Sequence, residues 1–475
     1  MNQSDEKTPA QVKAPVEAKE LYASHKKIYA RSVTGVFANL RVWGVVLTQL
    51  LFYCFPWLTW NGRPMMLFDL VHRKFYVFGY VFFPQDFVYL SGILVIAALT
   101  LFLVTAVAGR VWCGYACPQT VYTEIFMWIE RAIEGDRAQQ MKLAKSPWTP
   151  RKIGLKAAKH GAWIAVALWT GFTFVGFFTP IRDLAHEFAS FSLGPWETFW
   201  IFFYGFATYG FAGHMREQVC LYMCPYARFQ SVMFDPDTLI ITYDAKRGEP
   251  RGQRSKGADY RAEGKGDCVD CGICVQVCPT GIDIRKGLQY ECIGCAACID
   301  ACNQVMDKMA YPRGLIRYST ENVMQGKFPE RSMMSHVFRP RVLVYTAVLA
   351  TIAIALGVAI YLRTPLKVDI IRDRTNLVRE TDEGLLENVY GLQIINMDEK
   401  PHRYVLTASG MDDLKVTTNE AQPLLVEPAS TRVVSVSLIA DPKDLKPGSI
   451  PVHIRIQDVE NPGISVNEKT SFLVR

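Results

Sequence analysis

Three patterns in the sequence predict a multi-domain membrane protein. Five apolar stretches of about 20 residues predict a transmembrane bundle of five α-helices. Two copies of a cysteine spacing that is typical of bacterial two-cluster ferredoxins predict a ferredoxin-like α+β insert between the fourth and fifth helices. Short alternating apolar runs near the C-terminus predict an immunoglobulin-like β-sandwich.

The composition excludes several other classes of protein. The chain has 475 residues, of which 50% are hydrophobic, and it contains 13 cysteines. It is too apolar to be disordered throughout and too long for a small protein held together by disulfides. An odd number of cysteines also argues against a fully paired disulfide framework. The formal net charge of +7 has two possible origins, nucleic-acid binding or a membrane topology with basic loops on one side.

The first part of the chain predicts a tail followed by membrane helices. Residues 1–32 are polar and lack a signal-peptide pattern, so we expect a disordered cytosolic tail. Residues 33–235 then contain four of the five apolar stretches, and residues 341–362 contain the fifth. The stretches are residues 42–60, 88–109, 161–180, 196–213 and 342–362. The fourth is the weakest because Glu197 opens it and two glycines interrupt it, so a buried or re-entrant helix is the alternative there.

The loops between these stretches predict their orientation. Residues 110–159 carry nine basic residues, whereas residues 61–87 carry three and residues 181–195 carry one. Positive charge concentrates on the cytoplasmic side of a membrane, so we expect residues 110–159 in the cytoplasm. Alternation then places the N-terminus and residues 236–340 in the cytoplasm and residues 363–475 on the other side. The net charge is thus explained by topology, with no need for nucleic acid.

The C-terminal segment, residues 363–475, predicts the β-sandwich. Short runs with alternating apolar residues are separated by turn residues such as Pro447 and Gly448, and the segment contains no cysteine. We therefore expect a domain stabilised by its apolar core that acts in binding or docking. Four potential metal ligands on this side of the membrane are interpreted as surface residues: His72, His186, Met397 and His402.

The cysteines of the insert carry the clearest chemical signal. Residues 268–279 read CVDCGICVQVCP and residues 292–302 read CIGCAACIDAC, so both follow Cys-x2-Cys-x2-Cys-x3-Cys. In two-cluster ferredoxins the fourth cysteine of each motif binds the other cluster. The spacing therefore predicts two [4Fe–4S] clusters, one held by Cys268, Cys271, Cys274 and Cys302 and the other by Cys278, Cys292, Cys295 and Cys298. Zinc sites rarely use this spacing, so electron transfer is the favoured function.

Four further cysteines form a second matched pair of motifs. Both RVWCGYACP, ending at Pro118, and REQVCLYMCP, ending at Pro225, contain Cys-x3-Cys-Pro just beyond an even-numbered membrane stretch. Proline suits the first position of a helix, so the second cysteine of each motif is expected at a helix N-terminus. Cys113, Cys117, Cys220 and Cys224 are therefore candidates for a site for copper or another soft metal, or for a dithiol redox pair; ordinary buried residues at a bend are the alternative. Cys54 is interpreted as a packing residue.

These motifs resemble those of the FixG/RdxA/CcoG family. The strings that carry the resemblance are GRVWCGYACPQT (109–120), REQVCLYMCPYARFQSVMFD (216–235), RGEPRG (247–252) and CVQVCPTGIDIR (274–285). Members are accessory proteins of cbb-type cytochrome c oxidases in the bacterial inner membrane. The resemblance implies a periplasmic C-terminal domain and the reduction of Cu(II), as substrate, to Cu(I), with the thiols of Cys113, Cys117, Cys220 and Cys224 as participants in catalysis.

Three functions remain open from the sequence. The first is a cupric reductase that supports oxidase assembly. The second is a membrane ferredoxin that exchanges electrons with quinone, and the third is a redox sensor or scaffold that catalyses nothing. The expected partners are membrane lipid, an unidentified electron donor, and either oxidase assembly factors or a copper chaperone or transporter. No GxGxxG or Walker motif indicates bound NAD, FAD or ATP.

Overall fold

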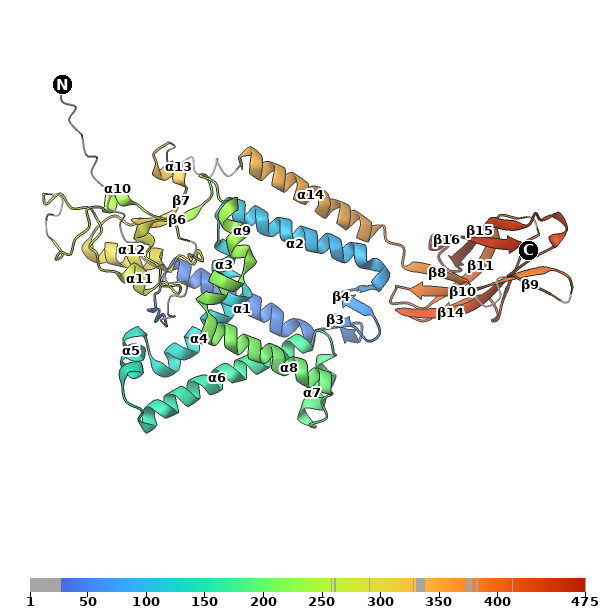
Figure 1. Ribbon diagram of the computed structural model, residues 1–475, viewed down its shortest axis with the longest axis horizontal. Coiled ribbons are helices and arrows are strands. Elements are labelled where there is room, and N and C mark those ends of the chain that lie inside the picture. The colour runs from blue at the N-terminus through green and yellow to red at the C-terminus, as the bar shows by residue number, and fades with distance from the viewer. Residues whose placement is uncertain are drawn as a thin grey trace, which may run out of the picture.

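The computed structural model describes residues 27–474, except 258, 260–261, 290, 328, 330–337, 373–377, 382 and 412. Most of the predicted N-terminal tail lies outside the described residues. The molecule is elongated, with a cysteine-rich module at one end, a β-sandwich at the other and long helices between them (Figure 1). The two ends are therefore separated by the length of the helices.

Within the described residues, three helices are long and apolar enough to cross a membrane. They are α1 (Val36–Cys54), which continues as a short 3-10 turn to Trp57, α2 (Phe87–Ala108) and α14 (Pro340–Tyr361). Helices α2 and α14 lie side by side, and most of their apolar side chains face outward rather than into protein. These helices coincide with the first, second and fifth predicted spans.

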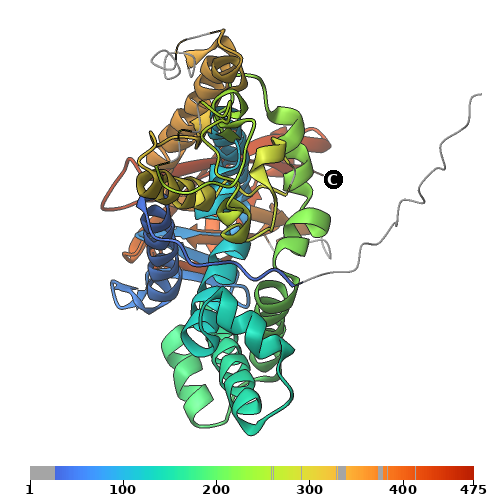
Figure 2. The ribbon, with the colours of Figure 1, turned by 90° about the vertical axis from the view of Figure 1, so that its left-hand side faces the viewer.

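The third and fourth predicted spans are not confirmed as membrane helices. Helix α6 (Pro150–Val175) contains most of the third but ends before residue 180, and it begins in the lysine-rich segment that precedes the apolar stretch. Helix α8 (Pro195–Thr208) has only 14 residues and continues as a π-helix, η3 (Tyr209–Met215). The two pack closely because Gly171 has no side chain: a Cβ there would lie 2.3 Å from the carbonyl oxygen of Ile201. Viewed from the cysteine-rich end, α5–α6 (teal) and α14 (orange) lie on opposite sides of the molecule (Figure 2).

The segment between α1 and α2 contains strands that the sequence analysis treated as a loop. Strands β3 (Met66–Asp69), β4 (Lys74–Val77) and β5 (Tyr80–Phe82) form an antiparallel sheet, preceded by the two-residue strands β1 (Thr59–Trp60) and β2 (Arg63–Pro64). Strands this short leave little periodicity in a sequence. A second connecting segment, between α6 and α8, forms helix α7 (Ile181–Ala189).

Several short helices connect the long ones to the cysteine-rich module. Helices α3 (Val111–Tyr115), α4 (Pro118–Glu134) and α5 (Arg137–Lys145) follow α2, whereas a π-helix, η4 (Val219–Met223), and α9 (Pro225–Met233) follow α8 and η3. Both Cys-x3-Cys-Pro motifs therefore lie in these connecting helices, at the same end of the long helices.

The cysteine-rich module has little regular structure. Strands β6 (Ile240–Tyr243) and β7 (Ile316–Ser319) pair antiparallel, and α12 (Ala297–Met309) is the longest helix. The other elements are single turns: α10 (Ala245–Gly248), α11 (Ile273–Gln276), the 3-10 turn η5 (Ile284–Lys286) and α13 (Glu321–Met324). This is the predicted α+β insert.

The C-terminal domain is the predicted sandwich of two antiparallel sheets. One sheet has the order β12-β14-β10-β8, with β9 also paired to β10, and the other has the order β13-β11-β15-β16. The strands are β8 (Leu366–Arg372), β9 (Arg379–Glu380), β10 (Leu386–Asn396), β11 (His402–Ser409), β12 (Lys415–Thr418), β13 (Leu424–Val426), β14 (Ser430–Ala440), β15 (Gly448–Asp458) and β16 (Ser465–Val474). Alternate residues such as Leu392 and Ile394 are fully buried between the sheets.

Three side chains differ from their predicted environments. His402 and Met397 were expected on the surface, but only 7% and 4% of their respective surfaces are exposed. Met397 packs with Val81 and Phe83 of the segment between α1 and α2, which joins the sandwich to the long helices. Cys54 was expected to pack inside the protein, but it is exposed on α1.

Candidate functional site

The eight cysteines of the module line two neighbouring cavities. A cavity of about 370 Å³ is lined by Cys268, Cys271, Cys274 and Cys302, which we call the distal group. A second cavity, of about 330 Å³, is lined by the helix-side group, Cys278, Cys292, Cys295 and Cys298. These are the two sets that the spacing predicts, with one cysteine exchanged between the motifs. Cys274 also lines the second cavity, so the two sites adjoin.

Equivalent turns in the two motifs bring the thiols together. Gly272 and Ala296 each follow the second cysteine of a motif, and both adopt a left-handed backbone, with φ of 65° and 59°. Helices α11 and α12 begin at the next residue. A left-handed residue turns the chain sharply, so the cysteines on either side of it can face one cavity.

The donor set and its surroundings fit iron–sulfur clusters. The cavities are otherwise lined mainly by apolar residues such as Ile282 and Ile293 on the helix side and Val305 and Leu315 on the distal side. Four thiolates around one cavity are the ligand set of a [4Fe–4S] cluster, whose irons each take one thiolate. Among the described residues, no three His, Cys, Asp or Glu side chains converge on a single ion. In a [4Fe–4S] cluster each thiolate binds a different iron atom, so the eight thiols need not converge on a single ion.

The four Cys-x3-Cys-Pro thiols interact with one another. Burial, with a contribution from the neighbouring Cys117 and Cys224 thiols, raises the pKa of Cys113 to about 11. Burial likewise raises the pKa of Cys220 to about 12, with contributions from the other three thiols. We call these four residues the thiol group.

The local structure around the thiol group follows the proline pattern. Cys117 and Cys224 are the N-cap residues of α4 and α9, which begin at Pro118 and Pro225, as predicted. The side-chain nitrogen of Gln230, which is fully buried on α9, lies 3.5 Å from the sulfur of Cys113. Among the described residues, no three of these thiols converge on a single ion position, so metal binding by the thiol group stays a prediction.

The thiol group lies directly against the helix-side cysteines. Cys113 and Cys220 pack on the buried cluster that contains Ile293 and Cys295. Gly114 makes this contact possible, because a Cβ there would lie 2.9 Å from the carbonyl oxygen of Gly294 and 3.0 Å from the Cα of Cys295. Both are backbone atoms that cannot rotate away. The distal group, the helix-side group and the thiol group therefore form one continuous series.

Hydrogen bonds hold the module against the connecting helices. Arg110 donates to the carbonyl oxygens of Cys292 at 3.1 Å and Ala227 at 2.9 Å. Tyr115 donates to the carbonyl oxygen of Cys295 at 3.5 Å. At the start of α1, the backbone amide of Ala38 donates to the carboxylate of Asp300 on α12 at 2.7 Å. The module is thus fixed to α1 and α3 beside its own metal ligands.

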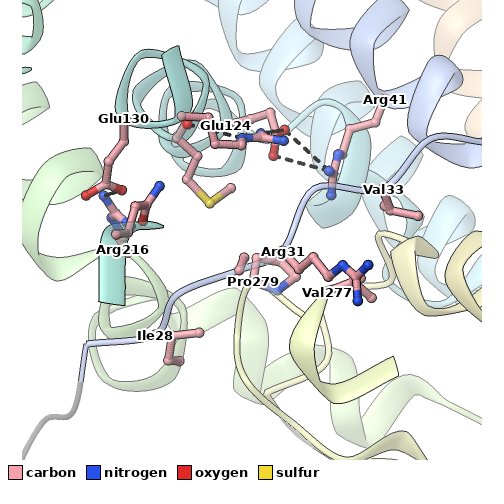
Figure 3. Close-up of a pocket in the computed structure, with 13 residues that line it drawn as sticks. Ile28, Arg31, Val33, Arg41, Glu124, Glu130, Arg216, Val277 and Pro279 are labelled. Carbon is pink, nitrogen blue, oxygen red and sulfur yellow. Dashed lines mark hydrogen bonds and ion pairs between the residues drawn. The ribbon is translucent and has the colours of Figure 1, made fainter. Parts of the chain in front are cut away.

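A polar cavity lies between α4, the segment around Arg31 and the module (Figure 3). Glu130 pairs with Arg216 at 2.9 Å on one side of it, and Glu124 pairs with Arg41 at 3.3 Å on the other. A neighbouring cavity shares both Arg41 and Arg216 and reaches Cys220. One member of the thiol group, Cys220, therefore lines this second cavity.

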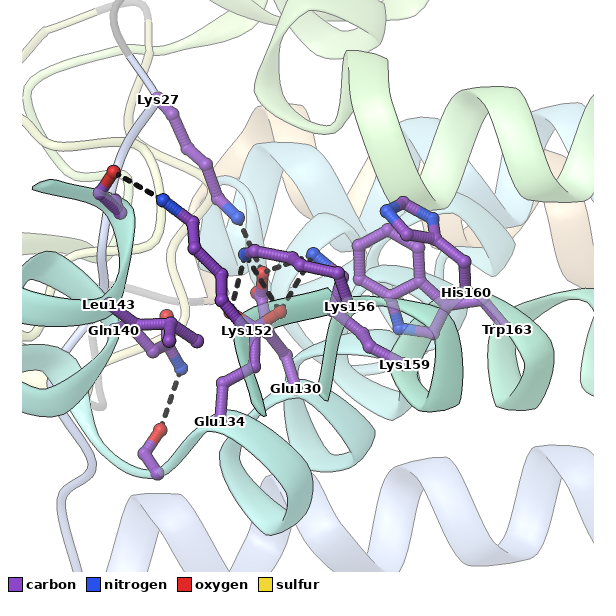
Figure 4. A network of polar contacts seen from close by, with 12 residues as sticks. Lys27, Glu130, Glu134, Gln140, Leu143, Lys152, Lys156, Lys159, His160 and Trp163 are labelled. Carbon is purple, nitrogen blue, oxygen red and sulfur yellow. Dashed lines mark hydrogen bonds and ion pairs between the residues drawn. The ribbon is translucent and has the colours of Figure 1, made fainter. Parts of the chain in front are cut away.

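A buried ionic network supports the cavity wall (Figure 4). Lys156 and Lys159 of α6 pair with Glu134 of α4 at 2.8 and 3.1 Å, and Lys27 pairs with Glu130 at 2.5 Å. Burial raises the pKa of Glu130, but Arg216 and Lys27 outweigh burial and lower the pKa to about 2. The network joins α6 to α4 and the N-terminal segment, which explains why the lysine-rich start of α6 is folded into the protein.

Comparisons with known proteins agree with this architecture. Residues 215–321 match a family described as "4Fe-4S dicluster domain", residues 90–135 match a "4Fe-4S binding domain", and residues 356–475 match the "IG-like fold at C-terminal of FixG". The fold and the cysteine sites define an iron–sulfur redox protein with helices suited to a membrane.

The particular family follows from three relatives. The chain is 38% identical to protein RdxB of Cereibacter sphaeroides over 86% of this chain and 87% of that one, and 35% identical to protein RdxA of the same organism over 93% and 96%. It is 39% identical to nitrogen fixation protein FixG of Rhizobium meliloti over 82% of this chain and 80% of that protein. The chain belongs to the FixG/RdxA/RdxB family.

Proposed function

We propose that this protein is a membrane-bound electron-transfer protein that reduces Cu(II) to Cu(I) during the assembly of a cbb-type cytochrome oxidase. The observation that carries the proposal is the continuous series from the distal group through the helix-side group to the thiol group. An electron that enters the module could pass through these three adjoining groups to Cys220, which lines a cavity.

The chemistry of the thiol group suits copper. Each iron–sulfur cluster, when bound, supplies one electron at a time. Reduction of Cu(II) takes one electron, so a protein with two reduced clusters can reduce two copper ions. Thiolates favour Cu(I) as ligands. Cys220 lines the cavity, so it would be the first thiol that an entering ion meets. The other three thiols are neighbours of Cys220.

The proposal includes a membrane topology with five spans. Helix α6 and the α8–η3 pair would supply the third and fourth spans. The cysteine-rich module and the β-sandwich lie at opposite ends of the long helices, which supports a cytoplasmic module and a periplasmic sandwich in a bacterial inner membrane (Figure 1). The basic residues of segment 110–159 support the same orientation. Copper reduction would then occur on the cytoplasmic side, where a copper chaperone or transporter could collect Cu(I).

The test is an anaerobic copper titration of the purified, dithionite-reduced protein. We expect Cu(II) to oxidise the clusters in EPR spectra while a Cu(I)-specific chelator records one Cu(I) for each electron lost. A variant with serine at positions 113, 117, 220 and 224 should keep its iron but lose this reaction. Cys54→Ser is the matched control, because Cys54 is exposed on α1 away from the site. Cu(II) reduction at the wild-type rate by the four-serine variant would refute the role of the thiols.

A further inference from the structure

We infer that Gln230 is a positioning residue for the thiol group, because its buried amide holds the sulfur of Cys113 in place before and after copper binds. Gln230 lies on α9, which follows the second Cys-x3-Cys-Pro motif, whereas Cys113 belongs to the first motif. The contact therefore links the two halves of the thiol group. The inference rests on the proposed role of these thiols as copper ligands.

The amide of Gln230 has a sulfur atom as its partner. Gln230 is fully buried, and its side-chain nitrogen lies 3.5 Å from the sulfur of Cys113. The same sulfur lies 3.6 Å from the side-chain oxygen of Gln230. A buried amide costs free energy unless it is hydrogen-bonded, and a neutral thiol is only a weak donor and acceptor. Packing alone does not call for an amide here, so the glutamine is better explained by a state of Cys113 that binds it more strongly.

Copper binding would create such a state. In the free thiol, the S–H group of Cys113 can donate to the amide oxygen, and the sulfur can accept from the amide N–H group. When Cu(I) binds, it replaces the proton, which is released to solvent, and the sulfur becomes a thiolate ligand. A hydrogen bond from the amide N–H group to an anionic sulfur is stronger than one to a neutral thiol. A glutamine can therefore hold the sulfur in both forms.

The helix that carries Gln230 is itself held in position. Tyr226, one turn earlier on α9, forms a hydrogen bond with the hydroxyl of Thr105 on α2 and donates to the carbonyl oxygen of Leu101 at 3.3 Å. Residues four positions apart lie on the same face of a helix. Tyr226 thus anchors the face of α9 from which Gln230 reaches Cys113, so the amide has a defined position relative to the sulfur.

The two halves of the thiol group differ at this position. Gln230 and Thr123 are equivalent, because each lies five residues beyond the proline of its motif. Thr123 lines the same cavity as Cys220, but its hydroxyl donates to a carbonyl oxygen of its own helix at 2.7 Å. Cys113 is thus the ligand that a side chain from the other motif holds in place, and Cys220 is the one that lines the cavity.

Infrared spectra of the reduced, full-length protein test the hydrogen bond directly. The S–H stretch absorbs in a region with few other protein bands, and its frequency falls when the S–H group donates a hydrogen bond. Cys113→Ser identifies the band of Cys113 as the one that disappears. Gln230→Met has a side chain of similar length but lacks the amide, so it should raise the frequency of this band.

A matched control is available elsewhere in the chain. Gln140 on α5 is also buried, but it donates to the carbonyl oxygen of Gly135 at 2.8 Å. Gln140→Met should therefore leave the Cys113 band unchanged. A band that stays in place in Gln230→Met, or that the control shifts equally, would overturn the inference.

Competition with a Cu(I)-specific chelator tests the copper-bound form. With Cu(I) alone as the probe and without oxygen, Gln230→Met should bind copper about 10- to 100-fold more weakly than the wild type, and Gln140→Met should match the wild type. Gln230→Asn keeps a buried amide but is one methylene shorter, so it should also bind copper more weakly even where the first variant fails to fold. Iron content reports the folding of both variants.

The outcomes separate this inference from the proposed function, because the competition needs no electron transfer. Wild-type affinity for Cu(I) in the folded Gln230 variants would overturn the inference alone. The expected affinities together with a failure to reduce Cu(II) would count against the proposed function alone. A wild-type protein that does not bind Cu(I) would overturn both.

Discussion

The two ends of the molecule are built on different physical principles. The β-sandwich has strands of up to 11 residues around a core of buried apolar side chains, and it contains no cysteine. The cysteine-rich module has two four-residue strands, one longer helix and a core that includes its own ligand cysteines. The sandwich can be stable through apolar burial alone, whereas the module depends on its metal.

Loss of a cluster ligand should give the largest effect, and we expect this effect to be confined to the cysteine-rich module. In Cys295→Ser, the helix-side cluster loses a ligand, so we expect iron to fall from about eight to about four atoms per chain. The module should become sensitive to protease while the melting transition of the sandwich stays unchanged. Iron analysis, limited proteolysis and calorimetry measure these outcomes. Full iron content in this variant would show that Cys295 is not a ligand.

The converse change in the sandwich should leave the iron intact. Phe472 is fully buried between the two sheets. Phe472→Ala should lower the free energy of unfolding of the sandwich by about 3–5 kcal/mol, because it creates a cavity in a packed core. Calorimetry of the full-length protein measures the loss. A simultaneous fall in iron content would show that the two ends are not independent.

A smaller effect is expected where the module meets the thiol group. Gly114→Ala adds a Cβ within 3.0 Å of backbone atoms of the helix-side motif, so the module must shift. We expect both clusters to remain but transfer to the thiols to slow by up to about 100-fold, since a displacement of about 1 Å can have an effect of that size. Gly154→Ala is the control, because its Cβ would contact nothing within 4 Å. Equal rates in the two variants would argue against transfer through this contact.

The smallest effect concerns pH and the sandwich alone. Burial lowers the pKa of His402, but hydrogen bonds to Asp398 and Asp458 outweigh burial and raise it above its ordinary value. The stability that these bonds contribute is fully present below the pKa of histidine in the unfolded chain, which is about 6.5. It is lost as the pH rises through the higher pKa of His402 in the folded protein, by at most about 1.4 kcal/mol per pH unit. Thermal melts between about pH 5.5 and about pH 8.5 should show this fall in the stability of the sandwich, and His402→Gln should abolish the fall.

The sequence predicted the parts of the site whose signal is local. The spacing within each ferredoxin motif brings its first three thiols to one cavity, because only a few residues of loop separate them. The prolines after Cys117 and Cys224 likewise predicted two helix N-termini. Alternation of apolar residues predicted the sandwich, whose strands are long enough to show it.

The contacts between distant segments were beyond such reasoning. Arg41 lies at the edge of an apolar stretch, and nothing in its neighbourhood indicates its ion pair with Glu124, 83 residues away in the sequence. Gln230 gives no local signal of its contact with Cys113 either. His402 was misplaced because its partner Asp458 lies on another strand, and burial of a histidine depends on that partner. The environment of such residues depends on contacts in the folded structure, and the spacing of residues along the chain does not indicate those contacts.

The contact between α1 and Asp300 also constrains how the protein is made. The chain is tightly packed at Gly35, where an added Cβ would lie 2.3 Å from the carboxyl carbon of Asp300, and the amide of Ala38 donates to that same carboxylate. During synthesis, the first long helix is complete well before the ribosome reaches residue 300. The start of this helix can therefore make its contact with α12 only after the cysteine-rich module has been synthesised.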